Sequence, residues 1–269
     1  MNNGPGLLSR LIRFVVTLCI VSGGVFTINN TIGLENMMNA GSEAVTNGFD
    51  GVSDAFGPSP VEGEGVRPYA DTNKDSLKTL ENNIGEFSNE KGYERSLFGD
   101  GWNNVGNKNS VGWEKFTPES CNVRKAVLIE QGENVEYDKT CDISGGTWTD
   151  PYGERNGGGK VEYHTSTTAR DFDIDHVVAL SLAWRSGASY LDDDLRNQIA
   201  NDKANLLISE AGINRSKGDQ DIVDWTPPVD SGSYCDYADR YAHVKAKYDL
   251  TVTQSEYDKL KEVIDSCNA

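Results

Sequence analysis

Apolar residues recur at helical intervals in several segments of the chain, and two further segments carry strand patterns. Spacing of three to four residues predicts helices over four ranges: 76–84, 123–131, 235–248 and 253–267. The segment 171–180 (DFDIDHVVAL) alternates charged and apolar residues and then turns apolar, which predicts a strand entering a core. A second strand is predicted at 205–208 (NLLI), and the turn-rich run 145–153 predicts a hairpin. Together these elements predict an α+β fold.

The N-terminal part of the chain lacks this regular pattern. Arg10 and Arg13 precede an apolar run at 14–28, which is shorter than the ~20 residues of a membrane span and is typical of a secretory signal or a signal anchor. Residues 29–74 are rich in Gly, Asn, Ser and acids, as in a spacer. We therefore expect a signal peptide or anchor at 1–28, a low-complexity linker at 29–74 and one domain at 75–269. Such a protein is secreted or held at the cell surface, with the N-terminal segment as a membrane tether if it is not cleaved.

Four cysteines follow the leader, which itself contains Cys19. Cys121, Cys141, Cys235 and Cys267 allow three disulfide connectivities, of which Cys121–Cys141 and Cys235–Cys267 closes the shortest loops. The absence of a C-x-x-C motif argues against a structural zinc site. An even number of cysteines in an exported chain favours disulfides, and we expect this shortest-loop pairing.

Charge is the main argument against a nucleic-acid partner. The chain has a net charge of −17 and a pI near 4.5, whereas binding to phosphates normally draws on Lys and Arg. Over residues 160–219, seven basic residues stand against ten acidic ones, a balance of −3. A divalent cation would have to supply much of the local attraction for a phosphate.

The strand at 171–180 nevertheless contains the residues that phosphodiester hydrolysis requires. His176 has an ordinary pKa near 6.5 and is expected to remove the proton from an attacking water. Asp175 is expected to hold a hard cation. The amide of Asn205 would accept from the imidazole and fix its tautomer, and Asn214, at the start of a short helix, would complete the metal site.

Lys217 and Arg185 are weaker candidates for phosphate binding. A solvated lysine explains Lys217 equally well, and a surface salt bridge with the acids at 192–194 explains Arg185 equally well. His243 is expected to be structural, and His164, Asp173 and Asp219 are at most supporting groups. The aromatic residues of GYERSLFGDGW (92–102) are expected to be core anchors.

Several separated motifs resemble one known family: GYERSLFGDGW, CNVRKAVL, GTWTDPYG, IDHVVALSLAWRSGA, NDKANLL and NRSKGD. In these the chain is similar to the secreted bacterial HNH endonucleases, which are related to the C-terminal nuclease domain of GmrSD-type restriction enzymes. The resemblance covers roughly residues 77–267. It implies a ββα-metal (HNH) core at about 170–218 with surrounding helices, His176 as general base, Asn205 as its orienting residue, and Asp175 and Asn214 as metal ligands. Oxygen ligands favour Mg²⁺ over zinc, with Mn²⁺ or Ca²⁺ as alternatives.

The expected function is therefore extracellular, metal-dependent hydrolysis of DNA, with RNA as an alternative substrate and no stable protein partner. Two other functions fit the same residues. One is a non-catalytic, metal-stabilised extracellular binding module, which the acidic composition favours. The other is a nuclease toxin. A nuclease assay with metal titration distinguishes the binding module, which would bind an ion without cleavage, from an enzyme. Expression in the cytoplasm of a host distinguishes the toxin, which should be lethal there.

Overall fold

The computed structural model describes residues 67–89, 91–152, 162–164, 172–227 and 233–269. The expected leader at 1–28 and most of the expected linker lie outside these residues. The described part is a mixture of helices and two small sheets, so the predicted α+β class is confirmed. Within it, no helix is long and apolar enough to cross a membrane.

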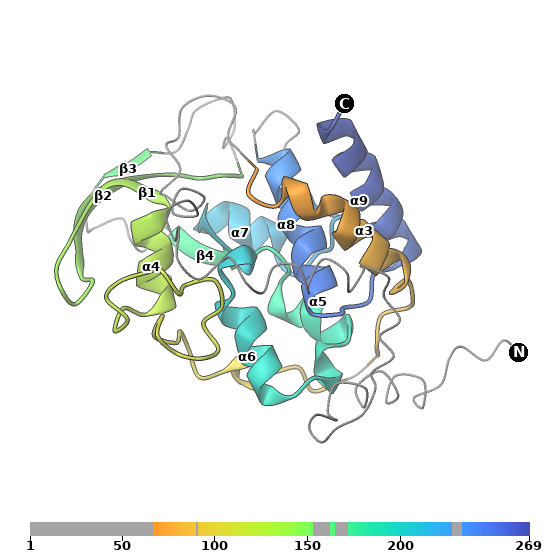
Figure 1. Ribbon diagram of the computed structural model, residues 1–269, viewed down its shortest axis with the longest axis horizontal. Helices are drawn as coiled ribbons and strands as arrows, with labels where there is room; N and C mark the ends of the chain where they lie inside the picture. Colours follow the sequence, from red (N-terminus) through yellow and green to blue (C-terminus); the bar gives the residue numbers. More distant parts are fainter. Residues whose placement is uncertain (1–66, 90, 153–161, 165–171, 228–232) are drawn as a thin grey trace, which may run out of the picture. The chain divides into compact units, whose positions relative to one another are not determined.

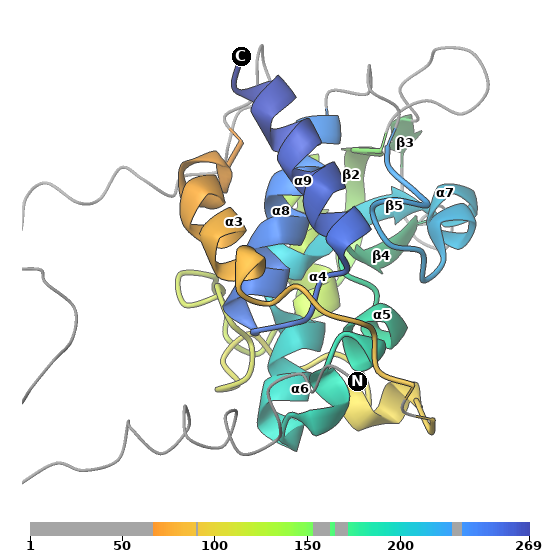
Figure 2. The same cartoon turned by 90° about the vertical axis from the view of Figure 1, so that its right-hand side faces the viewer.

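Three helices form a layer on one side of the fold. Helices α3 (Asn73–Glu81), α8 (Tyr234–Lys247) and α9 (Gln254–Cys267) lie side by side in both views (Figures 1 and 2). They share one apolar core, to which they contribute buried side chains that include Leu80, Tyr237, Tyr241, Leu260 and Ile264. The helical periodicity of the sequence predicts all three.

Polar contacts at the start of α9 and beside α8 fix this layer. A capping box begins α9: the side chain of Thr253 accepts from the backbone of Glu256, and the side chain of Glu256 accepts from the backbone of Thr253. Arg67 forms an ion pair with the buried Asp239 on α8 at 3.0 Å. The folded unit therefore includes residues 67–74, which composition assigns to the linker.

The sheet of three antiparallel strands lies on the other side, in the order β1 (Gly132–Tyr137), β2 (Ile143–Thr149) and β3 (Glu162–His164). Helix α4 (Val123–Glu130) leads into it, with Asn122 as its N-cap. Residues 145–149 of the expected hairpin at 145–153 belong to strand β2, which pairs antiparallel with β3, the next strand in the chain. Gly146 accommodates Trp148, because a Cβ on Gly146 would lie 2.7 Å from its ring.

A two-stranded ribbon lies between the two cores of the fold. Strand β4 (Phe172–His176) pairs antiparallel with β5 (Leu206–Glu210), so that Asp175 faces Leu207 and His176 faces Leu206. Leu206 packs into the core beside α4, whereas Leu207 packs into the core of the helical layer. Because successive side chains alternate across a strand, Asp175 and His176 lie on opposite faces of the ribbon.

Short helices complete the described structure. Helix α7 (Ala211–Lys217) follows β5 and contacts both strands of the ribbon, and α5 (Leu180–Arg185) and α6 (Asp193–Asn201) lie between β4 and β5 in sequence. Within the described residues, 3-10 turns join these elements: η2 (Ala70–Thr72), η3 (Arg95–Phe98), η4 (Ala188–Tyr190) and η5 (Lys203–Asn205).

Both expected disulfides are present. Cys121–Cys141 joins the segment before α4 to the β1–β2 connection, with 5.7 Å between Cα atoms. Cys235–Cys267 joins the first turn of α8 to the last turn of α9, with a Cα separation of 5.8 Å. The shortest-loop pairing is therefore confirmed, and each bridge lies in a different core of the fold.

Candidate active site

His176 ends strand β4 and is held on two sides. Its Nε2 lies 3.0 Å from the backbone oxygen of Ala200 on α6, and its ring stacks on Trp102, with 5.6 Å between centroids and 2° between planes. The side chain is only 6% exposed. Burial, with a further contribution from the charge of Arg95, lowers the pKa of His176 to about 3. The imidazole is therefore neutral at physiological pH.

The hydrogen bond to Ala200 also determines the tautomer. A carbonyl oxygen only accepts, so Nε2 must carry the hydrogen and Nδ1 must carry the lone pair. Nδ1 has no hydrogen-bond partner among the described residues. His176 therefore has one nitrogen fixed by the backbone and one free to accept a proton.

His176 lines a cavity of about 310 Å³. The segment 95–102 forms most of the wall, and Leu180 and Ala200 complete it. In this segment Phe98 is a buried core residue, as expected, but Trp102 is half-buried and contacts His176. Two of the lining residues, Gly99 and Gly101, have φ angles of 113° and 126°, which favour glycine.

Asn205 is fully buried and binds the backbone that follows His176. Its Oδ1 accepts from the Val178 amide at 2.8 Å, and its Nδ2 donates to the carbonyls of Val178 at 3.3 Å and Ile199 at 3.0 Å. The sequence predicts a direct contact with the imidazole, but the structure gives that contact to Ala200. Asn205 thus positions the turn after His176 and lies at the end of η5, just before β5.

Asp175 is 4% exposed and lies on the opposite face of the ribbon. Its Oδ1 accepts from the ammonium of Lys217 at 2.9 Å, and its Oδ2 accepts from the hydroxyl of Tyr152 at 2.6 Å. Lys217 is 0% exposed and also donates to the His176 carbonyl at 2.8 Å. Burial raises the pKa of Asp175, and the charge of Lys217 limits the rise.

Asn214 lies in the middle of α7, and its side chain contacts Asp173 in place of the expected neighbour Asp175. Its Nδ2 donates to Asp173 Oδ2 at 3.2 Å. Asp173 and Asp175 share one face of β4 because they are two residues apart. The sequence predicts that Asn214 begins its helix, but Glu210 is the N-cap and α7 starts at Ala211.

The expected cation ligands have suitable atoms but an unsuitable arrangement. Asp175 and Asn214 offer the oxygen atoms that hard cations prefer. However, both oxygens of Asp175 already accept hydrogen bonds, Lys217 neutralises its charge, and Asn214 is bonded to Asp173. Across the described ranges, no group of three or more His, Cys, Asp or Glu side chains could hold a metal ion. As the side chains stand, the pair does not fit a shared ion.

The expected phosphate-binding residues are both occupied. Lys217 is buried in its contacts with Asp175 and His176. Arg185 pairs with Asp219 at 2.8 Å, and this contact lowers the pKa of Asp219. The expected pairing of Arg185 with the acids at 192–194 is wrong, because these cap or pair elsewhere around α6.

Two of the lesser candidates lie on elements other than β4, which carries His176. His243 on α8 is half-buried and packs against Tyr69, with 4.6 Å between ring centroids, as expected of a structural histidine. The backbone of His164 lies on β3, opposite Thr147 of β2. His243 does not line the cavity at His176.

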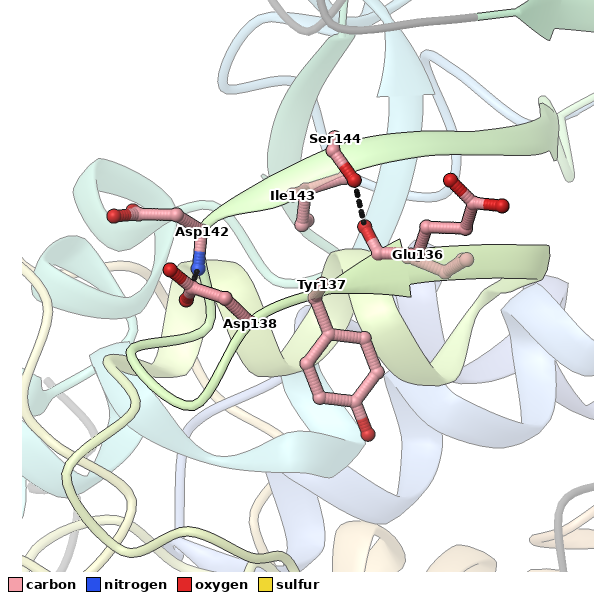
Figure 3. A pocket seen from close by; sticks show the side chains of 7 residues that line it. Glu136, Tyr137, Asp138, Asp142, Ile143 and Ser144 are labelled. Atoms are coloured by element: carbon pink, nitrogen blue, oxygen red, sulfur yellow. Dashed lines mark hydrogen bonds between the residues drawn. The ribbon is translucent and has the colours of Figure 1, made fainter.

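A second hollow, at the β1–β2 connection, has the wrong charge for a phosphate. Figure 3 shows Glu136, Asp138 and Asp142 around it, with Tyr137 and Ser144. The carboxylates of Asp138 and Asp142 have lowered pKa values because of hydrogen bonds with Thr140 and Lys125, so both are negative at neutral pH. An anionic substrate is therefore better suited to the cavity at His176.

More than half of the chain matches one protein family. The family described as "GmrSD restriction endonucleases, C-terminal domain" matches residues 113–263. The chain belongs to this family. The match spans the β4–β5 ribbon and α7 and confirms the relation that the sequence motifs indicate.

Other proteins similar to this member of the GmrSD C-terminal domain family are less informative about its chemistry. An "Uncharacterized secreted protein" of Arthroderma benhamiae is 39% identical over 150 residues, which cover 55% of this chain and 69% of the relative. That relative is fungal, so the resemblance extends beyond bacteria. No solved structure matches the chain. The family match supports a nuclease, and it begins after the segment 95–102 that lines the cavity.

Proposed function

We propose that the protein is an endonuclease that hydrolyses DNA phosphodiester bonds, with His176 as the general base. The observation that carries this proposal is the state of His176 in a member of a restriction-endonuclease domain family. Its imidazole is neutral, one nitrogen is fixed by Ala200, and the other is free on a ring that lines a cavity. A neutral histidine with a free nitrogen is what proton removal from water requires.

Substrate binding would adjust the basicity of His176. A base with a pKa near 3 accepts protons poorly at neutral pH. A phosphodiester anion near the ring favours the protonated form and counteracts the charge of Arg95, so it raises the pKa of His176. Asn205 holds the turn that carries the base, and Ala200 keeps the ring oriented during proton transfer.

The proposal includes the ββα-metal core and a divalent cation, with Mg²⁺ first and Mn²⁺ or Ca²⁺ as alternatives. Strand β4, strand β5 and helix α7 follow one another in the order of such a core. Asp175 and Asn214 are the proposed oxygen ligands, and binding there requires Lys217 and Tyr152 to release Asp175. The proposal needs this rearrangement, because Asp175 and His176 lie on opposite faces of the ribbon, whereas the cation and the base must act on the same phosphate.

We also propose that the protein acts outside the cytoplasm. Two disulfides join cysteines that stay reduced in most cytosols, and the fungal relative is named a secreted protein. The expected leader is consistent with export, and cell fractionation with detection of the processed N-terminus tests it.

The experiment for the activity is plasmid cleavage by the full-length, oxidised protein with Mg²⁺, Mn²⁺, Ca²⁺ or EDTA, and with an RNA of similar length as a second substrate. His176→Ala should abolish cleavage, whereas His243→Gln removes a histidine that lies away from the cavity and should leave it unchanged. An intact plasmid under all three metals, or full activity in His176→Ala, rules the proposal out. Ion binding without cleavage would instead identify a metal-stabilised binding module.

A further inference from the structure

Arg95 is an arginine without a counter-charge at the cavity that contains His176. It begins the 3-10 turn η3, is exposed and lines the cavity. Its side chain makes no ion pair or hydrogen bond with any residue that the structure describes. Several other arginines of the described part pair with an aspartate: Arg67 with Asp239, Arg185 with Asp219, Arg196 with Asp193 and Arg240 with Asp236. In a chain with a net charge of −17, acids are abundant, yet none of the described carboxylates pairs with Arg95.

The rest of the cavity wall leaves room for an anion next to Arg95. Ser96 contributes a hydroxyl, and a Cβ placed on Gly101 would meet no atom within 4 Å, so the wall is open there. Asp100 is the one carboxylate among the lining residues, and it forms no ion pair with Arg95. The charge of Arg95 acts across the cavity, because it is one cause of the lowered pKa of His176.

We propose that Arg95 binds a phosphate of the nucleic-acid substrate in this cavity, on the His176 face of the ribbon. The inference rests on the proposed nuclease function and adds a residue that lies outside the matched family region. A guanidinium fits a phosphate because its planar donors form two parallel hydrogen bonds with two phosphate oxygens. The volume of about 310 Å³ is at the lower end for ligand sites, so the cavity accepts one phosphate with its neighbouring sugar and not a whole duplex. The opposing charge of Asp100 limits the affinity.

The test measures binding separately from cleavage. The full-length protein is titrated into a fluorescent single-stranded DNA dodecamer in EDTA at several salt concentrations, and inorganic phosphate is used as a competitor. Arg95→Gln removes the guanidinium, Arg95→Lys keeps the charge but loses the paired donors, and Asp100→Asn removes the opposing charge. Lys78→Gln is the matched control, because Lys78 is an exposed cation on α3 that does not line the cavity. Thermal unfolding of each variant verifies that it folds.

We expect Arg95→Gln to weaken binding about tenfold or more and to lower the slope of log K against log salt by about 0.7, which corresponds to one phosphate contact on a single strand. Arg95→Lys should be intermediate, Asp100→Asn should bind more tightly, and Lys78→Gln should match the wild type. Equal losses for Arg95→Gln and Lys78→Gln, or no binding by the wild type, overturn the inference. If Arg95 supports binding but no metal supports cleavage, the proposed activity fails and this phosphate site stands. If cleavage occurs and its KM is unchanged in Arg95→Gln, only the phosphate site fails.

Discussion

Replacement of Asp175 by asparagine would leave a lysine without a counter-charge inside the protein. Lys217 is 0% exposed, and its ammonium donates only to Asp175 and to the His176 carbonyl among the described residues. Loss of one partner of a buried ion pair costs about 3–5 kcal/mol. Deprotonation of an ordinary lysine at pH 7 costs about 5 kcal/mol, which sets an upper limit on the penalty. We therefore expect Asp175→Asn to lower the free energy of unfolding by about 3–5 kcal/mol.

The measurement is urea denaturation at pH 7, followed by circular dichroism, on single and double variants. Asp175→Asn combined with Lys217→Met removes both charges and should recover most of the lost stability, because an apolar side chain tolerates the buried position. The control is Arg185→Gln, which breaks a pair whose side chains are 30% and 59% exposed and should cost less than about 1 kcal/mol.

The same variants distinguish a structural from a catalytic role of Asp175. If Asp175 is also a cation ligand, the double variant should be stable but inactive. If the buried pair serves the fold alone, the double variant should regain activity together with stability. A loss below about 1 kcal/mol in Asp175→Asn, or no recovery in the double variant, would refute the electrostatic reasoning.

Three further predictions concern His176, the cation and Asn205. The pKa of His176 is about 3 in the folded state and near 6.5 in the unfolded state, so the unfolded state binds a proton more readily. The free energy of unfolding should therefore fall as the pH decreases from about 6.5 towards 3, by at most about 5 kcal/mol. Urea titrations in which the wild type and His176→Gln show the same pH dependence would contradict this. EDTA should abolish plasmid cleavage. It should leave the melting temperature unchanged, because Lys217 already neutralises Asp175 without an ion. A large fall in melting temperature in EDTA would contradict this expectation about stability. Asn205→Ala loses three buried hydrogen bonds and should lower the free energy of unfolding, measured by chemical denaturation, by about 2–4 kcal/mol. The control Asn82→Ala, at an exposed position, should change it by less than about 0.5 kcal/mol. Similar losses in both variants would show that the contacts of Asn205 are not the cause.

The elements that can be predicted well from the sequence are those whose signal is local. The apolar periodicity of α3, α8 and α9 gives their positions within a few residues, and Thr253 with Glu256 gives the start of α9. The strand β4 and the adjacency of Asp175 and His176 are also readable, because they lie in one short segment. The two disulfides follow from loop length, given the expectation that the chain is exported.

The contacts that sequence reasoning misses join distant segments or involve the backbone. The partner of His176 is the carbonyl of Ala200, which has no side-chain signature. Trp102 and Arg95 precede His176 by more than 70 positions, and only the fold brings them to the same cavity. Gly146 predicts a turn because glycine is common in turns, but its missing side chain accommodates the ring of Trp148 within a strand.

The position of the β4–β5 ribbon between two cores affects when the site can form during synthesis. His176 and Asp175 are neighbours in sequence, yet their faces are covered by different cores, each with its own disulfide. The helical core requires α9, which begins 78 positions after His176 (254 minus 176). A ribosome thus adds strand β4 well before the helix that completes the helical core. The β4–β5 ribbon should therefore reach its final environment only after α9 has been synthesised and both cores have folded.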